Sequence, residues 1–264
     1  MEAMSSMPSM TRTRPENIVQ RKGMKREFIR TAGPSDFPRI VEVGVSSLNG
    51  DPIATYFGCT TPASLKTYLE FILNLAHSVG GVIDVTTVSE NESDEGEIVS
   101  AAIWLPPKKR INTFNVYKLL TSGCISLTQA LGTQGVTRLG WEYPSKISES
   151  WMQPELYLVS EGPSWSQADT WYLRLAFTAN KYQKQGIMIN MINRRLEAHP
   201  DSTFTLEATS PRSQHFFHAC FGFEMMNRST MGKGYVNESG EEQVRGHGVD
   251  VYSMLRKPVN RFNN

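Results

Sequence analysis

The stretch from residue 170 to residue 223 limits the possible folds of this chain most strongly, because the spacing of its apolar residues changes in a regular order. Within residues 171–178 a large apolar residue stands at every second position, which predicts a strand buried mainly on one face. The residues expected on that face are Trp171, Leu173, Leu175 and Phe177. A helix is predicted near 185–198, a strand at 204–208 and a helix ending at Gly222. Such alternation predicts an α/β sheet with right-handed crossovers.

The remaining sequence adds elements on both sides of this stretch. Alternation and capping residues predict a first strand at 25–30 and helices at 37–46 and 63–78. A hairpin follows, with strands at 82–88 and 98–105 and a polar tip at 89–97. Further strands are expected directly after Phe223 and at 249–255.

The domain organisation follows from length and local composition. At 264 residues the chain is long enough for one large core, and we expect a single domain over residues 27–258. Residues 1–26 are predicted to be a disordered basic tail, and residues 259–264 a second tail. Residues 108–169 form an insertion with a predicted helix at 115–131. Its composition fits either a substrate-side lid or a structural insertion that packs on the sheet.

Composition narrows the class of partner. The chain has 27 basic and 26 acidic residues, so no global field favours nucleic acid or an anionic membrane. No window approaches the roughly 18 consecutive apolar residues of a membrane span. Three cysteines without paired spacing indicate neither a disulfide framework nor a zinc ribbon. We therefore expect a cytoplasmic protein that acts on a small molecule, with its oligomeric state open.

The turn before the helix predicted near 185–198 offers groups that could bind an anion. Its residues are Gln183, Lys184, Gln185, Gly186, Ile187 and Met188. The first amides of a helix lack intrahelical partners and carry the positive end of the dipole, so a pyrophosphate would bind there. Lys184 adds a cation, and the side chain of Gln183 offers an amide donor. The turn is equally compatible with an ordinary strand-to-helix connection in which Gly186 relieves crowding.

The order of these pieces resembles the GNAT acetyltransferase superfamily, most closely its members from filamentous fungi. The resemblance covers residues 171–224 well, through Trp171 to Leu175, Tyr182-Gln183-x-x-Gly186, Leu206 to Ser210, Phe217 and Gly222-Phe223. Residues 101–107 are a weaker match, and the earlier elements match in order only. The resemblance implies a mixed central sheet with splayed parallel strands, flanked by helices.

The resemblance also implies a cofactor and roles for residues at matching positions. Acetyl-CoA would lie between the splayed strands, with its pantetheine against the backbone of Phe177 and Thr178 and its pyrophosphate on residues 183–188. The acetyl group would pass directly to an amine, which needs a base for the ammonium proton and an acid for the leaving thiolate. Glu207, near the end of a central strand, is a candidate base. It also fits a structural carboxylate that is hydrogen-bonded within the sheet.

Two positions depart from the family pattern. Met188 stands where members usually carry glycine or alanine, because a coenzyme phosphate passes close to the backbone there. His218 stands four residues before Gly222, where members often have a tyrosine that protonates the thiolate. A histidine can supply a proton near neutral pH, so His218 is the candidate acid, and it also fits a helix histidine without a role. His215, His218 and Cys220 lack a second ligand pair at metal-site spacing, so no metal is expected.

These residues support one main function and two alternatives. The main expectation is an acetyl-CoA-dependent N-acetyltransferase that acts on a small-molecule amine. The first alternative is a GNAT-fold enzyme of secondary metabolism that performs acid/base chemistry on a natural product without acetyl-CoA. The second is a catalytically silent binding protein, since fold and function are separable.

Overall fold

One seven-stranded mixed sheet forms the centre of the protein. The computed structural model describes residues 26–89, 96–111, 115–152 and 166–258. The strands are β1 (Arg26–Thr31), β2 (Val82–Ser89), β3 (Glu97–Leu105), β4 (Trp171–Thr178), β5 (Phe204–Ala208), β6 (Glu224–Met231) and β7 (Val249–Arg256). They are ordered β1-β2-β3-β4-β5-β7-β6, and of the neighbouring pairs β4 and β5 are parallel whereas the others are antiparallel. This confirms the predicted mixed sheet.

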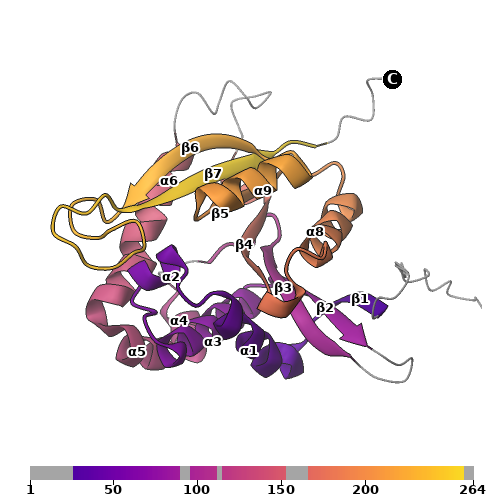
Figure 1. Cartoon of the computed structure of the whole chain (residues 1–264), viewed down its shortest axis with the longest axis horizontal. Helices are drawn as coiled ribbons and strands as arrows, with labels where there is room; N and C mark the ends of the chain where they lie inside the picture. Colours follow the sequence, from indigo (N-terminus) through magenta and orange to yellow (C-terminus); the bar gives the residue numbers. More distant parts are fainter. Residues whose placement is uncertain (1–25, 90–95, 112–114, 153–165, 259–264) are drawn as a thin grey trace, which may run out of the picture.

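Helices cover both faces of the sheet, as predicted (Figure 1). They are α1 (Phe37–Ser47), α2 (Pro52–Tyr56), α3 (Pro62–Ser78), α4 (Val116–Thr121), α5 (Cys124–Thr137), α6 (Tyr143–Trp151), α8 (Ile187–Ala198) and α9 (Pro211–Phe221). The larger apolar core lies between the sheet and α1, α3, α5 and α6. A second core lies between the opposite face and α8 and α9. The sheet is thus buried on both sides, which explains the apolar runs of its central strands.

Local sequence signals determine where the main helices begin. Thr61 precedes Pro62 and its side chain accepts a hydrogen bond from the Ser64 amide, so α3 starts with a filled cap. Ser210 caps α9 in the same way, through the amide of Ser213. Each cap satisfies an amide that has no intrahelical partner. The predicted helix starts at these two positions are confirmed.

Three sequence predictions need correction or lie outside the described residues. The single helix predicted at 115–131 is wrong, because Gly123 adopts a φ of 99° and separates α4 from α5. A left-handed residue cannot continue an α-helix, and glycine adopts this conformation without steric cost. Most of the predicted hairpin tip, at 90–95, lies outside the described residues. The same holds for the two predicted tails, apart from Arg26.

A β-bulge in β4 changes the faces of its side chains. Trp104 of β3 pairs with Leu173, and the preceding residue, Ile103, pairs with Leu175, so Arg174 is the extra residue. Trp171 and Leu173 therefore belong to the core under α8, whereas Leu175 and Phe177 pack in the core under α1. The prediction that all four lie on one face is wrong. One inserted residue reverses the alternation of every side chain beyond it.

The parallel pairing of β4 and β5 ends at this bulge. The paired residues are Trp171 with Phe204, Tyr172 with Thr205 and Leu173 with Leu206. Beyond Leu173 and Leu206 the two strands separate, which confirms the predicted splayed parallel strands. A bulge bends its strand away from the neighbouring strand. The separation leaves space between the carboxyl ends of two central strands.

The described part of residues 108–169 packs against the sheet. Helix α6 lies over β6 and β7, and the Ser150 hydroxyl lies 2.7 Å from the Ser253 hydroxyl in β7. The same helix carries Tyr143 and Trp151, both buried in the larger core. This segment therefore places aromatic side chains beside the ends of the central strands.

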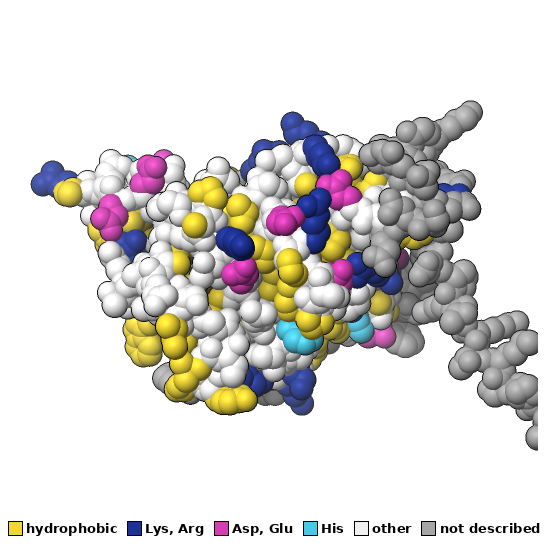
Figure 2. Space-filling view, turned by 90° about the horizontal axis from the view of Figure 1, so that it is seen from below, with side chains coloured by type: hydrophobic (Ala, Val, Ile, Leu, Met, Phe, Trp, Pro, Cys, Tyr) yellow, Lys and Arg dark blue, Asp and Glu magenta, His cyan; other side chains and the backbone are white. Residues whose placement is uncertain are grey.

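The face of the molecule that Figure 2 shows carries charges of both signs. Seen from below, the molecule carries basic side chains next to acidic ones, without a broad area of one sign (Figure 2). Among the described residues, no helix is both long enough and apolar enough to cross a bilayer.

Candidate active site

A cavity of about 220 Å³ lies where β4 and β5 separate. Its walls come from the second half of β4, the end of β5, the start of α9, and the segments around α2, α3 and α6. The residues that line it include Asp51, Tyr68, Tyr143, Arg174, Glu207, Ser210, Ser213 and Phe217. Ligands of open sheets that contain parallel strands bind outside the carboxyl ends of those strands. This cavity is therefore the candidate active site.

Glu207 contributes a hydrogen-bonded carboxylate to the cavity wall. Trp151 donates its indole N–H to Oε1 over 3.0 Å, and Gln167 donates its side-chain amide to the same oxygen over 3.3 Å. The Tyr172 hydroxyl donates to Oε2. A carboxylate has about four acceptor positions on its two oxygens, so these donors leave room for one more partner. Both predicted roles of Glu207, base and structural carboxylate, agree with this geometry.

The surroundings of Glu207 raise the pKa of its carboxyl group. Burial raises the pKa of the Glu207 carboxyl, and the donors Tyr172 and Trp151 and the cation of Arg174 oppose that rise. Burial and the charge of Glu207 together raise the pKa of Tyr172, which keeps this phenol a proton donor. A carboxylate with a raised pKa is a stronger general base than an ordinary one.

Arg174, the bulged residue, places a cation in the same cavity. Its guanidinium carbon lies 5.7 Å from the centre of the Tyr143 ring. Among the described residues, none forms a hydrogen bond or an ion pair with it. Sequence reasoning did not select Arg174 as a site residue. A charged residue in the middle of an otherwise apolar central strand was the available signal.

The turn before α8 presents free backbone amides. Lys184 and Gly186 have φ values of 61° and 86°, and Gly186 is the N-cap residue of α8. In the part of the chain that the structure describes, no acceptor takes the N–H groups of residues 184–189. Successive free amides at a helix start, with left-handed residues among them, form an anion-binding concavity. The turn at residues 183–188 thus has free amides at a helix start, and phosphate binding there stays a prediction.

The glutamine side chains of this turn hold its shape. Gln183 donates its side-chain amide to the Thr178 carbonyl over 3.1 Å and to Asn180 Oδ1 over 2.9 Å. Gln185 donates to the Lys181 carbonyl over 2.9 Å. Both side-chain amides are therefore engaged within the loop. The backbone of the turn, with the exposed Lys184, is left to meet an anion.

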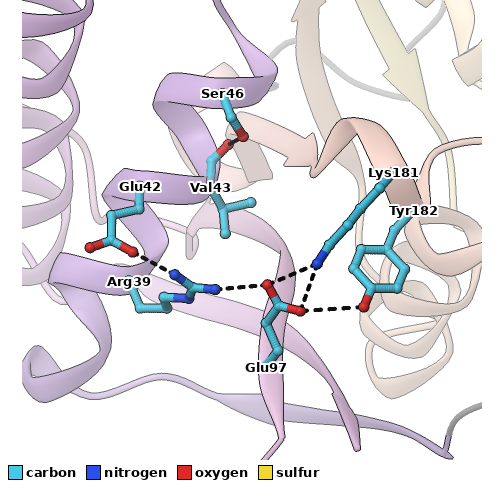
Figure 3. A network of polar contacts seen from close by, with 7 residues as sticks. All are labelled: Arg39, Glu42, Val43, Ser46, Glu97, Lys181 and Tyr182. Atoms are coloured by element: carbon cyan, nitrogen blue, oxygen red, sulfur yellow. Dashed lines mark hydrogen bonds and ion pairs between the residues drawn. The ribbon is translucent and has the colours of Figure 1, made fainter.

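Charged groups from three elements fix the turn against the hairpin (Figure 3). Glu97, the first residue of β3, accepts from Lys181 over 2.9 Å and from Arg39 of α1 over 2.7 Å. The Tyr182 hydroxyl also donates to Glu97, over 3.3 Å. These partners lower the pKa of the Glu97 carboxyl, chiefly through the hydrogen bond from Lys181. The carboxylate thus stays charged and holds the segment that leads into the turn.

The other residues predicted to bind the cofactor lie in the protein core near the turn. The Phe177 ring packs against Gly44 of α1, and the Phe177 carbonyl accepts from the Ser100 hydroxyl over 2.8 Å. Thr178 is buried, with its hydroxyl 2.8 Å from that of Ser100. Ile187 is buried in a small cluster with Val88 and Val99. None of these side chains lines the cavity.

Met188 packs on the sheet beside the second core. It is half-buried and contacts the cluster that contains Ile192 and Leu196, the other members of its predicted stripe. Met188 is not among the residues that line the cavity. Its side chain therefore leaves the space between β4 and β5 open.

His218 lies away from Glu207. It is exposed on α9, and its Nδ1 lies 2.9 Å from the Phe223 carbonyl. The side chains of α9 that line the cavity are those of Ser213 and Phe217. The structure thus brings Glu207 together with Trp151, Tyr172 and Arg174, but not with His218.

Metal ligands do not cluster in the described residues. No group of three or more His, Cys, Asp or Glu side chains that could hold a metal ion occurs among them.

Comparison with known proteins shows the fold. No protein-family model matches the sequence, and no curated protein matches it. An arylalkylamine N-acetyltransferase 2 from Aedes aegypti aligns with a TM-score of 0.55 at 14% identity, covering 88% of this chain and 98% of that chain.

Two further solved structures align equally well. A structure described as histone acetyltransferase HPA2 and related acetyltransferase, from Corynebacterium glutamicum, has a TM-score of 0.54 at 19% identity and covers 90% of this chain and 99% of its own. A polyamine N-acetyltransferase from Drosophila melanogaster has a TM-score of 0.54 at 10% identity, with 88% and 99% covered. The chain therefore has the fold of the GNAT acetyltransferase superfamily.

Proposed function

We propose that this protein is an N-acetyltransferase that transfers an acetyl group from acetyl-CoA directly to the amino group of a small molecule. The observation that carries the proposal is the pairing of two features at one end of β4. A run of free amides begins α8, and a cavity with a hydrogen-bonded carboxylate opens where β4 leaves β5. Solved structures of similar fold are named as arylalkylamine and polyamine N-acetyltransferases, which supports an amine acceptor.

The turn at residues 183–188 fits the pyrophosphate of the coenzyme. The free N–H groups of residues 184–189 would donate to its oxygens, and Lys184 would add a positive charge. Gln183 and Gln185 would keep the loop in this shape through their bonds to Thr178 and Lys181. Phe177 and Thr178, at the end of β4, would lie beside the pantetheine. When bound, acetyl-CoA supplies an acetyl thioester to the cavity.

Glu207 would take the proton of the acceptor. Its carboxylate would accept a proton from the ammonium group, directly or through one water, so that the amine nitrogen gains a free electron pair. That nitrogen would form a bond to the thioester carbon and lose a second proton, while the carbon–sulfur bond breaks and the thiolate takes up a proton. Trp151, Gln167 and Tyr172 would hold the carboxylate in place during these steps.

The source of the thiolate proton is a separate question. His218 is the acid that family resemblance suggests, but its exposed position beside the Phe223 carbonyl does not support that role. The proposed function requires Glu207 and the turn, and it does not require His218.

The test begins with coenzyme binding. Titration calorimetry with acetyl-CoA and with free coenzyme A should show binding to the wild-type protein. A panel of small amines should then release free thiol at a rate that depends on the amine. Absence of binding at millimolar coenzyme would refute the proposal and favour the enzyme that works without acetyl-CoA. Binding without turnover on any amine would favour the silent binding protein.

A further inference from the structure

Arg174 is a half-buried cation that forms no hydrogen bond with any described residue. Two other half-buried arginines, Arg110 and Arg195, do form hydrogen bonds. Arg110 donates to the carbonyls of Gln167 and Thr170, over 2.5 and 2.8 Å, and Arg195 donates to Asp84 over 2.6 and 3.0 Å. Arg174 has no such partner among the described residues. Because a guanidinium does not lose its proton in proteins, it keeps its charge in the cavity.

The surroundings of Arg174 stabilise its charge without occupying its donors. The negative charge of the Glu207 carboxylate acts favourably on the cation. The Tyr143 ring lies 5.7 Å from it, at cation–π range. No carboxylate oxygen of a described residue lies within 4.0 Å of its nitrogens, the limit for an ion pair. The guanidinium therefore has N–H donors free to meet a ligand.

Arg174 and Glu207 occupy equivalent positions on the two separating strands. Arg174 follows Leu173, and Glu207 follows Leu206, the partner of Leu173 in the last parallel pair. Both side chains line the same cavity. The cavity between the separating strands therefore has a cation on β4 and an anion on β5. This arrangement suits a ligand that carries both a negative and a positive group.

We propose that the acceptor carries a carboxylate as well as its amino group, and that Arg174 binds this carboxylate. This inference rests on the proposed function, since it names the class of acceptor. The planar fork of a guanidinium matches a carboxylate with two parallel N–H···O bonds. The ammonium end would lie toward Glu207, where one acceptor position remains. The acceptor is thus an amino acid rather than a simple amine.

The experiment uses acceptors in matched pairs that differ only by the carboxylate. Tyrosine and tyramine, arginine and agmatine, and γ-aminobutyrate and propylamine cover two spacings between the charges. For at least one pair, kcat/KM for the acid should exceed that for the amine by roughly 10- to 100-fold, the range for a hydrogen bond to a charged group. Preference for the amine in every pair would overturn the inference.

Substitution of Arg174 separates carboxylate binding from other roles. In Arg174→Gln the preference for the acid should fall by roughly 10- to 100-fold, and Arg174→Lys should keep part of it. The control is Arg228→Gln, which removes an arginine that is exposed and paired with Asp250, and which should keep the full preference. If Arg174 instead polarised the thioester, both members of each pair would slow equally. An unchanged preference would therefore contradict the inference.

Binding measurements distinguish this inference from the proposed function. Calorimetry with the same pairs needs no acetyl transfer, so it remains informative if acetyl-CoA does not bind. Tighter binding of the acid by wild type, lost in Arg174→Gln, would support the carboxylate site even without turnover. Circular dichroism and the midpoint of thermal unfolding establish that the variant is folded. Equal affinity for acid and amine in every pair would overturn the inference.

Discussion

Trp151 donates its indole N–H to Oε1 of Glu207 over 3.0 Å, which joins the end of α6 to the end of β5. The two residues are far apart in sequence, and Glu207 lines the cavity between the separating strands. A donor to the charged form of a carboxyl lowers its pKa. Trp151 therefore helps to keep the half-buried Glu207 ionised.

Trp151→Phe should raise the pKa of Glu207 further, because the variant keeps an aromatic ring but loses the N–H donor. The pH at which kcat/KM reaches half its maximum should move upward, and the protein should lose on the order of 1.5–3 kcal/mol of stability. Rate profiles against pH and chemical denaturation measure the two effects. Trp141→Phe, at an exposed tryptophan, is the control. An identical pH profile for wild type and Trp151→Phe would mean that the bond has no influence on Glu207.

Glu207→Gln should lower kcat roughly 10²- to 10⁴-fold, the usual contribution of a general base. Calorimetry should find coenzyme affinity almost unchanged, because the turn at residues 183–188 is separate from the cavity wall. The rising limb of the pH–rate profile that belongs to this carboxyl should disappear. A rate within a few-fold of wild type would assign Glu207 a purely structural role.

The same variant makes a prediction about stability and pH. The pKa of Glu207 is raised in the folded protein above its ordinary value of 4.5, so folding favours the protonated form. This contribution is fully present below pH 4.5 and is lost as pH rises through the folded-state pKa. The unfolding free energy of wild type relative to Glu207→Gln should therefore fall as pH rises above 4.5. Denaturation at a series of pH values checks the sign, and a difference that grows with pH would refute it.

Gly186→Ala should weaken coenzyme binding, because Gly186 has a φ of 86° at the N-cap of α8. A left-handed conformation costs a residue with a side chain about 1–2 kcal/mol. Gly234→Ala is the matched control, since Gly234 has a φ of 95° with no atom near a new methyl group. Both variants should lose similar stability, but calorimetry should find weaker acetyl-CoA binding in Gly186→Ala alone. Equal affinity in both would show that the turn does not bind the coenzyme.

Asp84→Asn should destabilise the protein by about 3–5 kcal/mol, the usual cost of breaking a buried ion pair. Asp84 and Arg195 are 5% and 14% exposed and are joined by two hydrogen bonds, which fix α8 to β2. Glu149→Gln, in the exposed pair with Lys146, should change stability by less than about 1 kcal/mol. Urea denaturation measures both. Similar small losses would mean that the buried pair does not anchor the helix.

His218→Phe should change kcat by less than about threefold, since surface substitutions away from a site have small effects. The Nδ1 contact with the Phe223 carbonyl would be lost, and α9 should remain folded. Steady-state rates with a fixed acceptor provide the measurement. A loss of tenfold or more in kcat with unchanged coenzyme affinity would instead support the acid role that family resemblance suggests.

The sequence by itself determined the order and the boundaries of most elements. Helix α9 begins where Ser210-Pro211 supplies a cap and ends where Gly222 supplies a left-handed residue, and both signals are local. The turn before α8 was equally readable, because Gly186 follows a strand and precedes an apolar stripe. Local patterns suffice here because capping and periodicity depend on neighbours in the chain.

Only the tertiary structure decided which side chains meet. The bulge at Arg174 depends on how β4 pairs with β3, and no local pattern encodes an inserted residue. That bulge reverses the face of Phe177, ends the parallel pairing and brings Arg174 into the cavity. Trp151 reaches Glu207 because α6 packs over the sheet, although the sequence around it is the least regular in the chain. His218, whose position in the sequence suggested a site, lies outside the cavity because Phe217 takes that place.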